Sequence, residues 1–192
     1  CTTSPGHGDA IPYGHPLNAG SAGPRGSGLG TQLLKEADVI LALGSRLGFN
    51  TTFYSYDNLN KNASIIQCEI DQNSIGRYFP VEVGIHADAK IVADQLCNLL
   101  EKHKAKQEVE AWTDQFKSNK KNYLEQRDAE ADMDSVPILP SGLFKGLRNA
   151  LPDDSVVTLD AGTMCLQLTD ALHYHQPKSL FSPLDFGLVG FS

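Results

Sequence analysis

Two apolar runs constrain the fold of this chain more than any other feature. Residues 37–44 read ADVILALG and residues 63–71 read ASIIQCEID, and neither run alternates regularly between apolar and polar positions. A run without alternation is typical of a parallel strand that is covered on both faces. A third and weaker run, VEVGIHAD, follows at residues 81–88. The three runs therefore predict neighbouring parallel strands.

Segments with helical spacing lie between and after these runs. TQLLKEAD precedes the first run, and DAKIVADQLCNLLEKHK follows the third, with Asp88 as its expected N-cap. The second segment places five apolar residues on one stripe, namely Ile91, Val92, Leu96, Leu99 and Leu100. Strands that alternate with helices indicate βαβ units with right-handed crossovers. We therefore predict an α/β fold with a doubly wound, Rossmann-like parallel sheet.

The charge pattern divides the chain into three parts. Residues 1–105 hold the predicted sheet, residues 106–139 are highly charged and predict a helical linker, and residues 140–192 begin a second α/β unit. SVVTLDAG is the one clear strand of that unit, which is too little for an independent core. The first domain would lack the strand and helix with which a doubly wound sheet usually starts. The glycine-spaced apolar end, FGLVGFS, likewise favours a longer protein.

Composition excludes several classes of partner. A net charge of −7 and a pI near 5.3 argue against a nucleic-acid surface, which needs clustered Lys and Arg. The one basic run, residues 117–121, is expected to be a solvated helix face. No apolar run approaches the roughly 20 residues that span a bilayer, and no signal-peptide pattern opens the chain. We expect a cytoplasmic protein without a membrane partner.

No metal site is predicted from the sequence. The four cysteines are far apart and form no C-x-x-C pattern, which suits reduced thiols. His173 and His175 lack other ligands at suitable spacing and are expected at the surface. GHGDA, at residues 6–10, is interpreted as a loop rather than as a magnesium-phosphate site.

Three groups of residues are candidates for ligand binding. The glycine-rich loop around Gly26 and Gly28 would point the amides of residues 26–29 at an anion from a helix N-terminus, or would simply connect two elements. Its G-x-G-x-G spacing matches neither common nucleotide fingerprint. Arg46 follows the first strand and would bind a phosphate or carboxylate, or form an interdomain salt bridge. Glu69 and Asp71 end the second strand, where acids commonly bind a ribose.

Catalysis by these residues is not indicated. Glu69 and Asp71 share a strand face, but no nucleophile or partner base accompanies them. No G-x-S-x-G elbow supports a hydrolase triad either.

The motifs, in their order, resemble those of a known family. CTTSPGHGDAIP, HPLNAG, ADVILALGSRL, IIQCEIDQNSIGR and GIHADAK are similar to the central domain of thiamine-diphosphate-dependent enzymes of the acetolactate synthase type. This resemblance covers roughly residues 1–100. SVVTLDAG resembles the first strand of that family's diphosphate-binding domain. FGLVGFS resembles its G-x-Φ-G-F segment, where Φ is a bulky apolar residue.

The resemblance implies a cofactor site. The turn that begins at Asp160 would hold the diphosphate, and the bulky apolar residue would support the bent cofactor so that its aminopyrimidine nitrogen meets the thiazolium carbon. The cofactor is the electron sink and the protein supplies geometry. The residues that would bind thiamine diphosphate are Gly162, Thr163, Gly187, Val189 and Gly190.

The sequence also departs from the family pattern. The family's G-D-G…N magnesium-diphosphate motif and the domain with the activating glutamate are not found in these 192 residues. We therefore assign no catalytic residue, expect the isolated chain to be inactive, and expect Mg²⁺ to bind in the parent enzyme. FAD is a second cofactor of acetolactate synthases, but GSAG places Ala22 where their histidine stands, which argues against FAD.

The leading hypothesis is part of a thiamine-diphosphate-dependent carboligase, decarboxylase or acetyltransferase. Its substrate would be a 2-oxo acid or related small carbonyl compound, and the parent would be a homodimer or homotetramer. One alternative is a stand-alone module that binds FAD or ADP through Gly26, Gly28, Arg46, Glu69 and Asp71. The other alternative is a spacer domain with a purely structural role.

Overall fold

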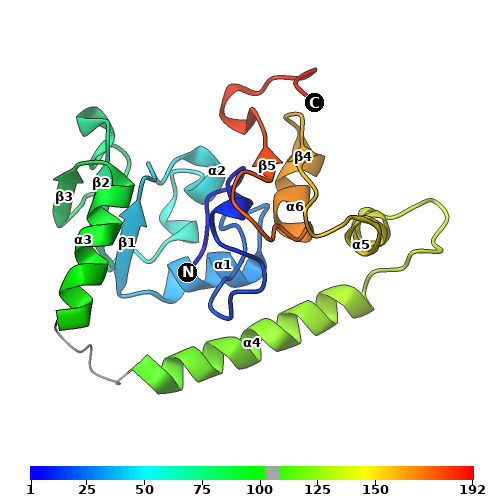
Figure 1. The fold of residues 1–192 in the computed structure, drawn as a ribbon, viewed down its shortest axis with the longest axis horizontal. Coiled ribbons are helices and arrows are strands. Elements are labelled where there is room, and N and C mark those ends of the chain that lie inside the picture. Colours follow the sequence, from blue (N-terminus) through cyan, green and yellow to red (C-terminus); the bar gives the residue numbers. More distant parts are fainter. Residues whose placement is uncertain (103–108) are drawn as a thin grey trace.

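A parallel sheet forms the centre of the first part of the molecule (Figure 1). The computed structural model describes residues 1–102 and 109–192, so the predicted boundary between residues 105 and 106 lies outside the described residues. The strands β1 (Val39–Leu43), β2 (Ser64–Glu69) and β3 (Val83–His86) lie side by side in that order, and all are parallel. Apolar, β-branched runs favour this arrangement. The predicted strands and the α/β fold class are confirmed.

Helices connect and flank these strands. α1 (Gly28–Glu36) precedes β1, and α3 (Ala89–Lys102) follows β3. Asp88 Oδ1 accepts the backbone N–H of Lys90 at 2.9 Å and that of Ile91 at 3.3 Å, which confirms Asp88 as the predicted N-cap. The shorter helical elements are η1 (Gly8–Ala10), α2 (Phe49–Thr52), η2 (Tyr56–Asn58) and η3 (Gln72–Ser74).

The prediction that both faces of the sheet are covered is wrong for β1. Ile40 and Ala42 are buried in one core with Leu34 of α1. On the other face, Val39, Leu41 and Leu43 are 54%, 45% and 38% exposed. The stripe on α3 is also mostly exposed, and within it only Val92 is buried. The physical reason is that α1 packs against one face, while no described element covers the opposite face of β1.

An open groove of about 580 Å³ lies between β1 and the start of the chain. Residues 1–4 line one side of it, and residues 40–45 line the other. Thr3 pairs with Ser21 as a parallel bridge, so this stretch of chain is itself strand-like. The groove is therefore bordered by extended backbone on both sides.

The second part of the molecule contains a smaller parallel sheet. β4 (Val157–Thr158) pairs with β5 (Leu180–Phe181), and α5 (Pro140–Ala150) and α6 (Thr163–Ala171) pack against each other beside them. Leu172, Tyr174 and Leu180 form its small core. β5 is not predicted from the sequence, because two apolar residues in an otherwise polar stretch give no strand signal. η5 (Leu184–Phe186) follows β5.

The long helix α4 (Glu110–Ala129) runs beneath both parts of the molecule and ends near α5 (Figure 1). Its Phe116 is buried against Leu29 of α1. Lys120 Nζ donates to the carbonyl oxygen of His15 at 2.9 Å, so Lys120 is only partly solvated and departs from the predicted solvated helix face. The helix α4 therefore does more than link, because it packs against both parts.

Within residues 1–102 and 109–192, no helix combines the length and hydropathy that a membrane crossing requires.

Candidate functional site

The turn at Asp160 and residues 187–190, which the sequence resemblance assigns to a cofactor site, lie together at the carboxyl edge of the small sheet. The backbone N–H of Ala161, beyond β4, donates to the carbonyl oxygen of Leu188, beyond β5, at 3.0 Å. Because the carboxyl ends of parallel strands meet at one edge, two loops far apart in the sequence become neighbours. The turn at Asp160 and the 187–190 segment therefore form one candidate site.

The Asp160 carboxylate makes three more bonds across this site. Asp160 Oδ2 accepts the backbone N–H of Gly190 at 2.7 Å, and Oδ1 accepts those of Phe191 and Ser192 at 2.7 and 2.9 Å. These bonds stabilise the ionised form, and they lower the pKa of Asp160 to about 2. The carboxylate is therefore charged throughout the physiological pH range.

The first turn of α6 borders the same edge. The first amides of a helix have no intrahelical acceptor, and they carry the positive end of the helix dipole. Gly162 stands at the N-cap with extended backbone and provides no side chain to cap these amides. A Cβ at Gly162 would meet no heavy atom within 4 Å, so the space beside the helix N-terminus is open. Such an end can bind an anion, including a diphosphate.

Exposed apolar side chains lie beside this helix end. Val189 is 82% exposed and Leu188 is 53% exposed. Gly187 and Gly190 have φ values of +63° and +90°, which glycine adopts without strain. The predicted residues Gly162, Thr163, Gly187, Val189 and Gly190 thus gather at one edge, which combines amide donors with an apolar surface.

The residues of the nucleotide hypothesis make internal hydrogen bonds instead. The N–H groups of Gly26 and Ser27 donate to the carbonyl oxygens of Gly23 and Ser21, so the prediction that these two amides face an anion is wrong. The reason is the tight turn before α1, in which Ser27 also caps the helix through Gly30 N–H. Gly28 begins α1, and a Cβ there would lie 3.6 Å from the Tyr123 ring.

Arg46 forms the salt bridge that was one of its two predicted roles. Its Nη2 lies 2.8 Å from Asp185 Oδ2, and Asn50 donates to the other carboxylate oxygen. Both Arg46 and Asp185 are more than half exposed, so the contribution of the pair to stability is small. This contact connects the first domain to η5 of the second unit.

The carboxylates of Glu69 and Asp71 accept hydrogen bonds from backbone N–H groups within two residues along the chain. Glu69 Oε1 accepts the N–H groups of Ile70 and Asp71. Asp71 caps η3 by accepting the N–H of Asn73. The hydrogen bond from Ser74 Oγ, together with that from the Asn73 N–H, lowers the pKa of Asp71. The two acids therefore shape the turn after β2.

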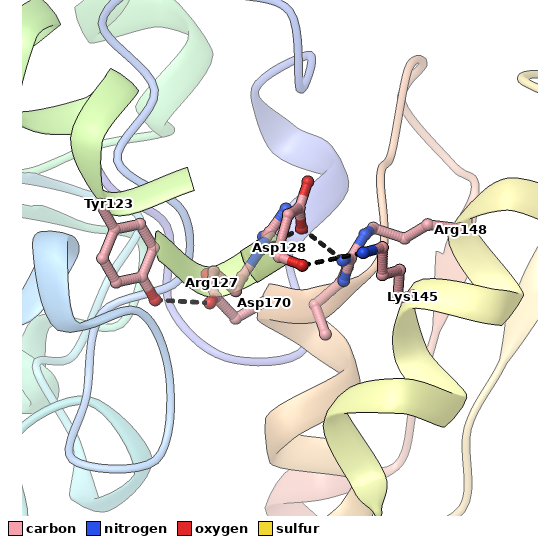
Figure 2. Close-up of polar contacts among 7 residues, drawn as sticks. Tyr123, Arg127, Asp128, Lys145, Arg148 and Asp170 are labelled. Carbon is pink, nitrogen blue, oxygen red and sulfur yellow. Dashed lines mark hydrogen bonds and ion pairs between the residues drawn. The ribbon is translucent and has the colours of Figure 1, made fainter. Parts of the chain in front are cut away.

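A polar cluster between the helices was missed by sequence reasoning (Figure 2). Figure 2 shows Asp128 of α4 facing Arg148 of α5, at an Nη2–Oδ1 distance of 2.6 Å. Tyr123 of α4 donates to Asp170 of α6 at 3.4 Å. Their spacing along the chain carries no common motif, so no signal in the sequence could have found this cluster.

Asp9 is a second residue that sequence reasoning missed. It lies in the loop predicted at GHGDA, and it is buried. Its Oδ2 accepts the N–H groups of Ser179 and Leu180 at 3.1 and 3.3 Å. An apparently ordinary loop thereby binds the start of β5, some 170 residues away in the sequence.

His173 is only partly exposed, which corrects the prediction of a surface histidine in part. Its ring stacks on Tyr13 with centroids 3.6 Å apart. Burial, with Arg127 and Arg148 nearby, lowers the pKa of His173 to about 4, so it is neutral at pH 7. His175 is exposed, in agreement with the prediction.

These features define an α/β protein whose Rossmann-like sheet is joined to a second parallel unit with an open helix N-terminus. The model of the family "Thiamine pyrophosphate enzyme, central domain" matches residues 1–96, which is half of the chain. The chain belongs to this family. The sequence resemblance is thereby confirmed.

Curated proteins of similar sequence include acetyltransferases and acetolactate synthases. The chain is 31% identical to the sulfoacetaldehyde acetyltransferase of Alcaligenes xylosoxydans xylosoxydans, over 96% of the chain and 34% of that protein. It is 28% identical to the probable acetolactate synthase large subunit of Methanococcus aeolicus, over 100% of the chain and 33% of that protein. It is also 28% identical to the acetolactate synthase isozyme 3 large subunit of Escherichia coli, over 95% of the chain and 31% of that protein. The chain spans about a third of the length of these relatives.

Proposed function

We propose that this chain is part of a thiamine-diphosphate-dependent carboligase, decarboxylase or acetyltransferase and contributes part of the cofactor site. The observation that carries this proposal is the junction of the Asp160 turn with the 187–190 segment, held by the Ala161–Leu188 backbone bond. The donors at this edge are backbone amides at a helix end, which suit a diphosphate. The exposed Val189 suits the organic part of the cofactor.

Each group in the site has a distinct task in this proposal. When bound, thiamine diphosphate supplies the electron sink for reactions at a carbonyl carbon. The amides of Thr163 and Met164, in the first turn of α6, hold the diphosphate, and Gly162 keeps the approach to them open. Val189 supports the organic part of the cofactor. None of these residues takes part in proton transfer.

Mg²⁺ would accompany the diphosphate in the parent enzyme. This ion prefers oxygen ligands and usually binds through one or two carboxylates together with phosphate oxygens. Asp160 is a poor ligand for this ion, because backbone N–H groups already take three of the about four acceptor sites of its carboxylate. We assign none of the described residues as a ligand of the ion.

The substrate and assembly follow from the relatives by analogy. The acetyltransferases and acetolactate synthases among them favour a small carbonyl compound, such as a 2-oxo acid or a close relative, as the substrate. We propose a cytoplasmic homodimer or homotetramer. The exposed apolar residues of β1 and α3 support an assembled state, since large exposed patches often mark interfaces.

The domain organisation is proposed as residues 1–105, 106–139 and 140–192. The groove between residues 1–4 and β1 supports the view that the first sheet accepts one further strand. Its two sides are a strand-like segment and an edge strand, and unpaired edges tend to recruit a strand.

Replacing Gly162 by Ala tests the diphosphate site. The added methyl would meet no protein atom within 4 Å, so the free energy of unfolding should change by less than about 0.5 kcal/mol. The same methyl would occupy the open space before the first turn of α6. We expect thiamine diphosphate, titrated calorimetrically with Mg²⁺ into the full-length protein, to bind at least about tenfold more weakly.

The matched control is Gly146→Ala on α5. A Cβ at Gly146 also meets nothing within 4 Å, but Gly146 lies on α5, outside the proposed site. Its affinity for thiamine diphosphate should equal that of the unsubstituted protein. Equal affinity in the Gly162→Ala protein, or no binding by the unsubstituted protein, would contradict the proposal.

A further inference from the structure

The carboxylate of Asp160 is the most heavily bonded side chain at the candidate site. It accepts three successive backbone N–H groups, from Gly190, Phe191 and Ser192, all within 2.9 Å. Successive amides that converge on one anion form a nest, which is a favourable site for negative charge. Here the anion is supplied by the protein itself, from a turn about thirty residues earlier in the chain. The carboxylate thereby binds one loop to another.

A carboxylate suits this position better than any neutral side chain of its size. Its two oxygens provide about four acceptor sites, and its charge strengthens each hydrogen bond. An asparagine has one acceptor oxygen, and its amide nitrogen would face an N–H group. The low pKa of Asp160 agrees with this environment, because the three amides favour the ionised form.

The backbone bonds lie on both sides of Val189. On one side, the carbonyl oxygen of Leu188 accepts the N–H of Ala161. On the other side, the N–H of Gly190 donates to Asp160. The intervening side chain of Val189 is 82% exposed and packs against little of the protein. Its direction is therefore set by these two backbone contacts rather than by packing.

We propose that Asp160 is a positioning residue that holds the 188–191 backbone so that Val189 faces the organic part of thiamine diphosphate. This inference rests on the proposed function. Asp160 does not touch the cofactor itself, and it acts through the backbone on either side of Val189. Its loss should therefore weaken binding of the organic part and leave binding of the diphosphate part unchanged.

The first experiment follows the backbone without any cofactor. Hydrogen exchange of the amides of residues 190–192 should become at least about tenfold faster in the Asp160→Asn protein. The reason is that the charged carboxylate, which accepts all three of these N–H groups, is lost. Asp185→Asn is the matched control, since Asp185 bonds Arg46 and Asn50 instead. Unchanged exchange in the Asp160→Asn protein would overturn the proposal.

The second experiment compares two ligands, each titrated with Mg²⁺ into the full-length protein. Asp160→Asn should weaken the binding of thiamine diphosphate about tenfold and change the affinity for inorganic diphosphate by no more than about twofold. Val189→Ala should show the same pattern, and the double variant should lose little more than either single variant. Such non-additivity indicates that the two residues act as one unit. A general structural defect would instead weaken the binding of both ligands, and its loss of affinity would add to that of Val189→Ala.

The outcomes separate this inference from the proposed function. Equal weakening of both ligands, or additive effects, would overturn the positioning role while the cofactor site stands. If the unsubstituted protein binds neither ligand, the proposed function fails, and the cofactor part of the inference fails with it. The exchange experiment still decides whether Asp160 holds the segment, because it needs no cofactor.

Discussion

Replacing Asp170 by Asn should stabilise the protein by up to about 3 kcal/mol at pH 7.5 and have almost no effect at pH 4. Asp170 lies on α6, where its carboxyl group is surrounded by protein atoms although part of the residue reaches solvent. Loss of hydration raises its pKa from 3.8 to about 6. The difference of about two pKa units corresponds to the stated free energy.

The surroundings explain why the shift is large. Arg127 and Arg148 favour the ionised form, as do hydrogen bonds from Tyr123 and from the backbone of Ser21. Loss of hydration is nevertheless the largest influence, because the carboxyl group lies between α4, α6 and the loop at Gly20 (Figure 2). A Cβ at Gly20 would clash with the Asp170 carboxylate, which shows how closely the loop approaches.

The direction of the pH dependence follows from the raised pKa. Between the unfolded pKa of 3.8 and the folded pKa of about 6, the folded protein binds more protons than the unfolded chain. Stability from this group is therefore greatest below pH 3.8, falls as the pH rises to 6, and then stays constant. Asparagine does not titrate, so this loss should disappear in the Asp170→Asn protein.

Urea unfolding at pH 4, 5, 6 and 7.5 measures this effect. Asp114→Asn on α4 is the control, since Asp114 is 73% exposed and should change the free energy of unfolding by less than about 0.5 kcal/mol at each pH. Parallel curves for the Asp170→Asn and unsubstituted proteins would show that the Asp170 pKa is not raised.

Replacing Arg148 by Ala should destabilise the protein by about 2–4 kcal/mol. The Arg148 side chain is only 5% exposed. It donates to Asp128 Oδ1 at 2.6 Å and to the carbonyl oxygen of Ala171 at 3.1 Å (Figure 2). It thereby connects α4, α5 and the end of α6. Truncation leaves a carboxylate and a carbonyl oxygen without this partner.

The expected loss lies toward the lower end of this range because Asp128 is 49% exposed and can be rehydrated. Arg148→Lys should retain part of the stability, since an ammonium group can reach one acceptor but lacks the planar geometry for both. Urea unfolding at pH 7.5 measures both variants. Lys121→Ala is the control, because its pair with Glu125 is exposed and 3.9 Å long. A loss for Arg148→Ala no greater than for Lys121→Ala would contradict the prediction.

Local patterns in the sequence predict much of the fold. The apolar runs at residues 37–44 and 63–71 became β1 and β2, and Asp88 became the N-cap of α3. These features depend on neighbours within a few residues, which is why a single sequence reveals them. The family resemblance added the residues at the end of the chain, which have no recognisable chemistry of their own.

The site depends on contacts that no local pattern contains. Gly162 and Val189 were predicted from the resemblance, but the role of the Asp160 side chain was not, because its partners lie about thirty residues away. Asp9 and Arg148 were missed for the same reason. A carboxylate or guanidinium in the sequence gives no sign of which distant amide or carbonyl it will meet.

The sequence by itself determined the strands of the first sheet, the helices that flank them, the N-cap Asp88 and the family to which the chain belongs, because these follow from short-range periodicity and ordered motifs. Only the tertiary structure decided which face of β1 is covered, that Arg46 pairs with Asp185, and that Asp170 is enclosed with a raised pKa. Burial and pairing depend on what packs against a residue from elsewhere in the chain. The position of Val189 is the clearest case, since its neighbours Leu188 and Gly190 both form backbone contacts with the Asp160 turn.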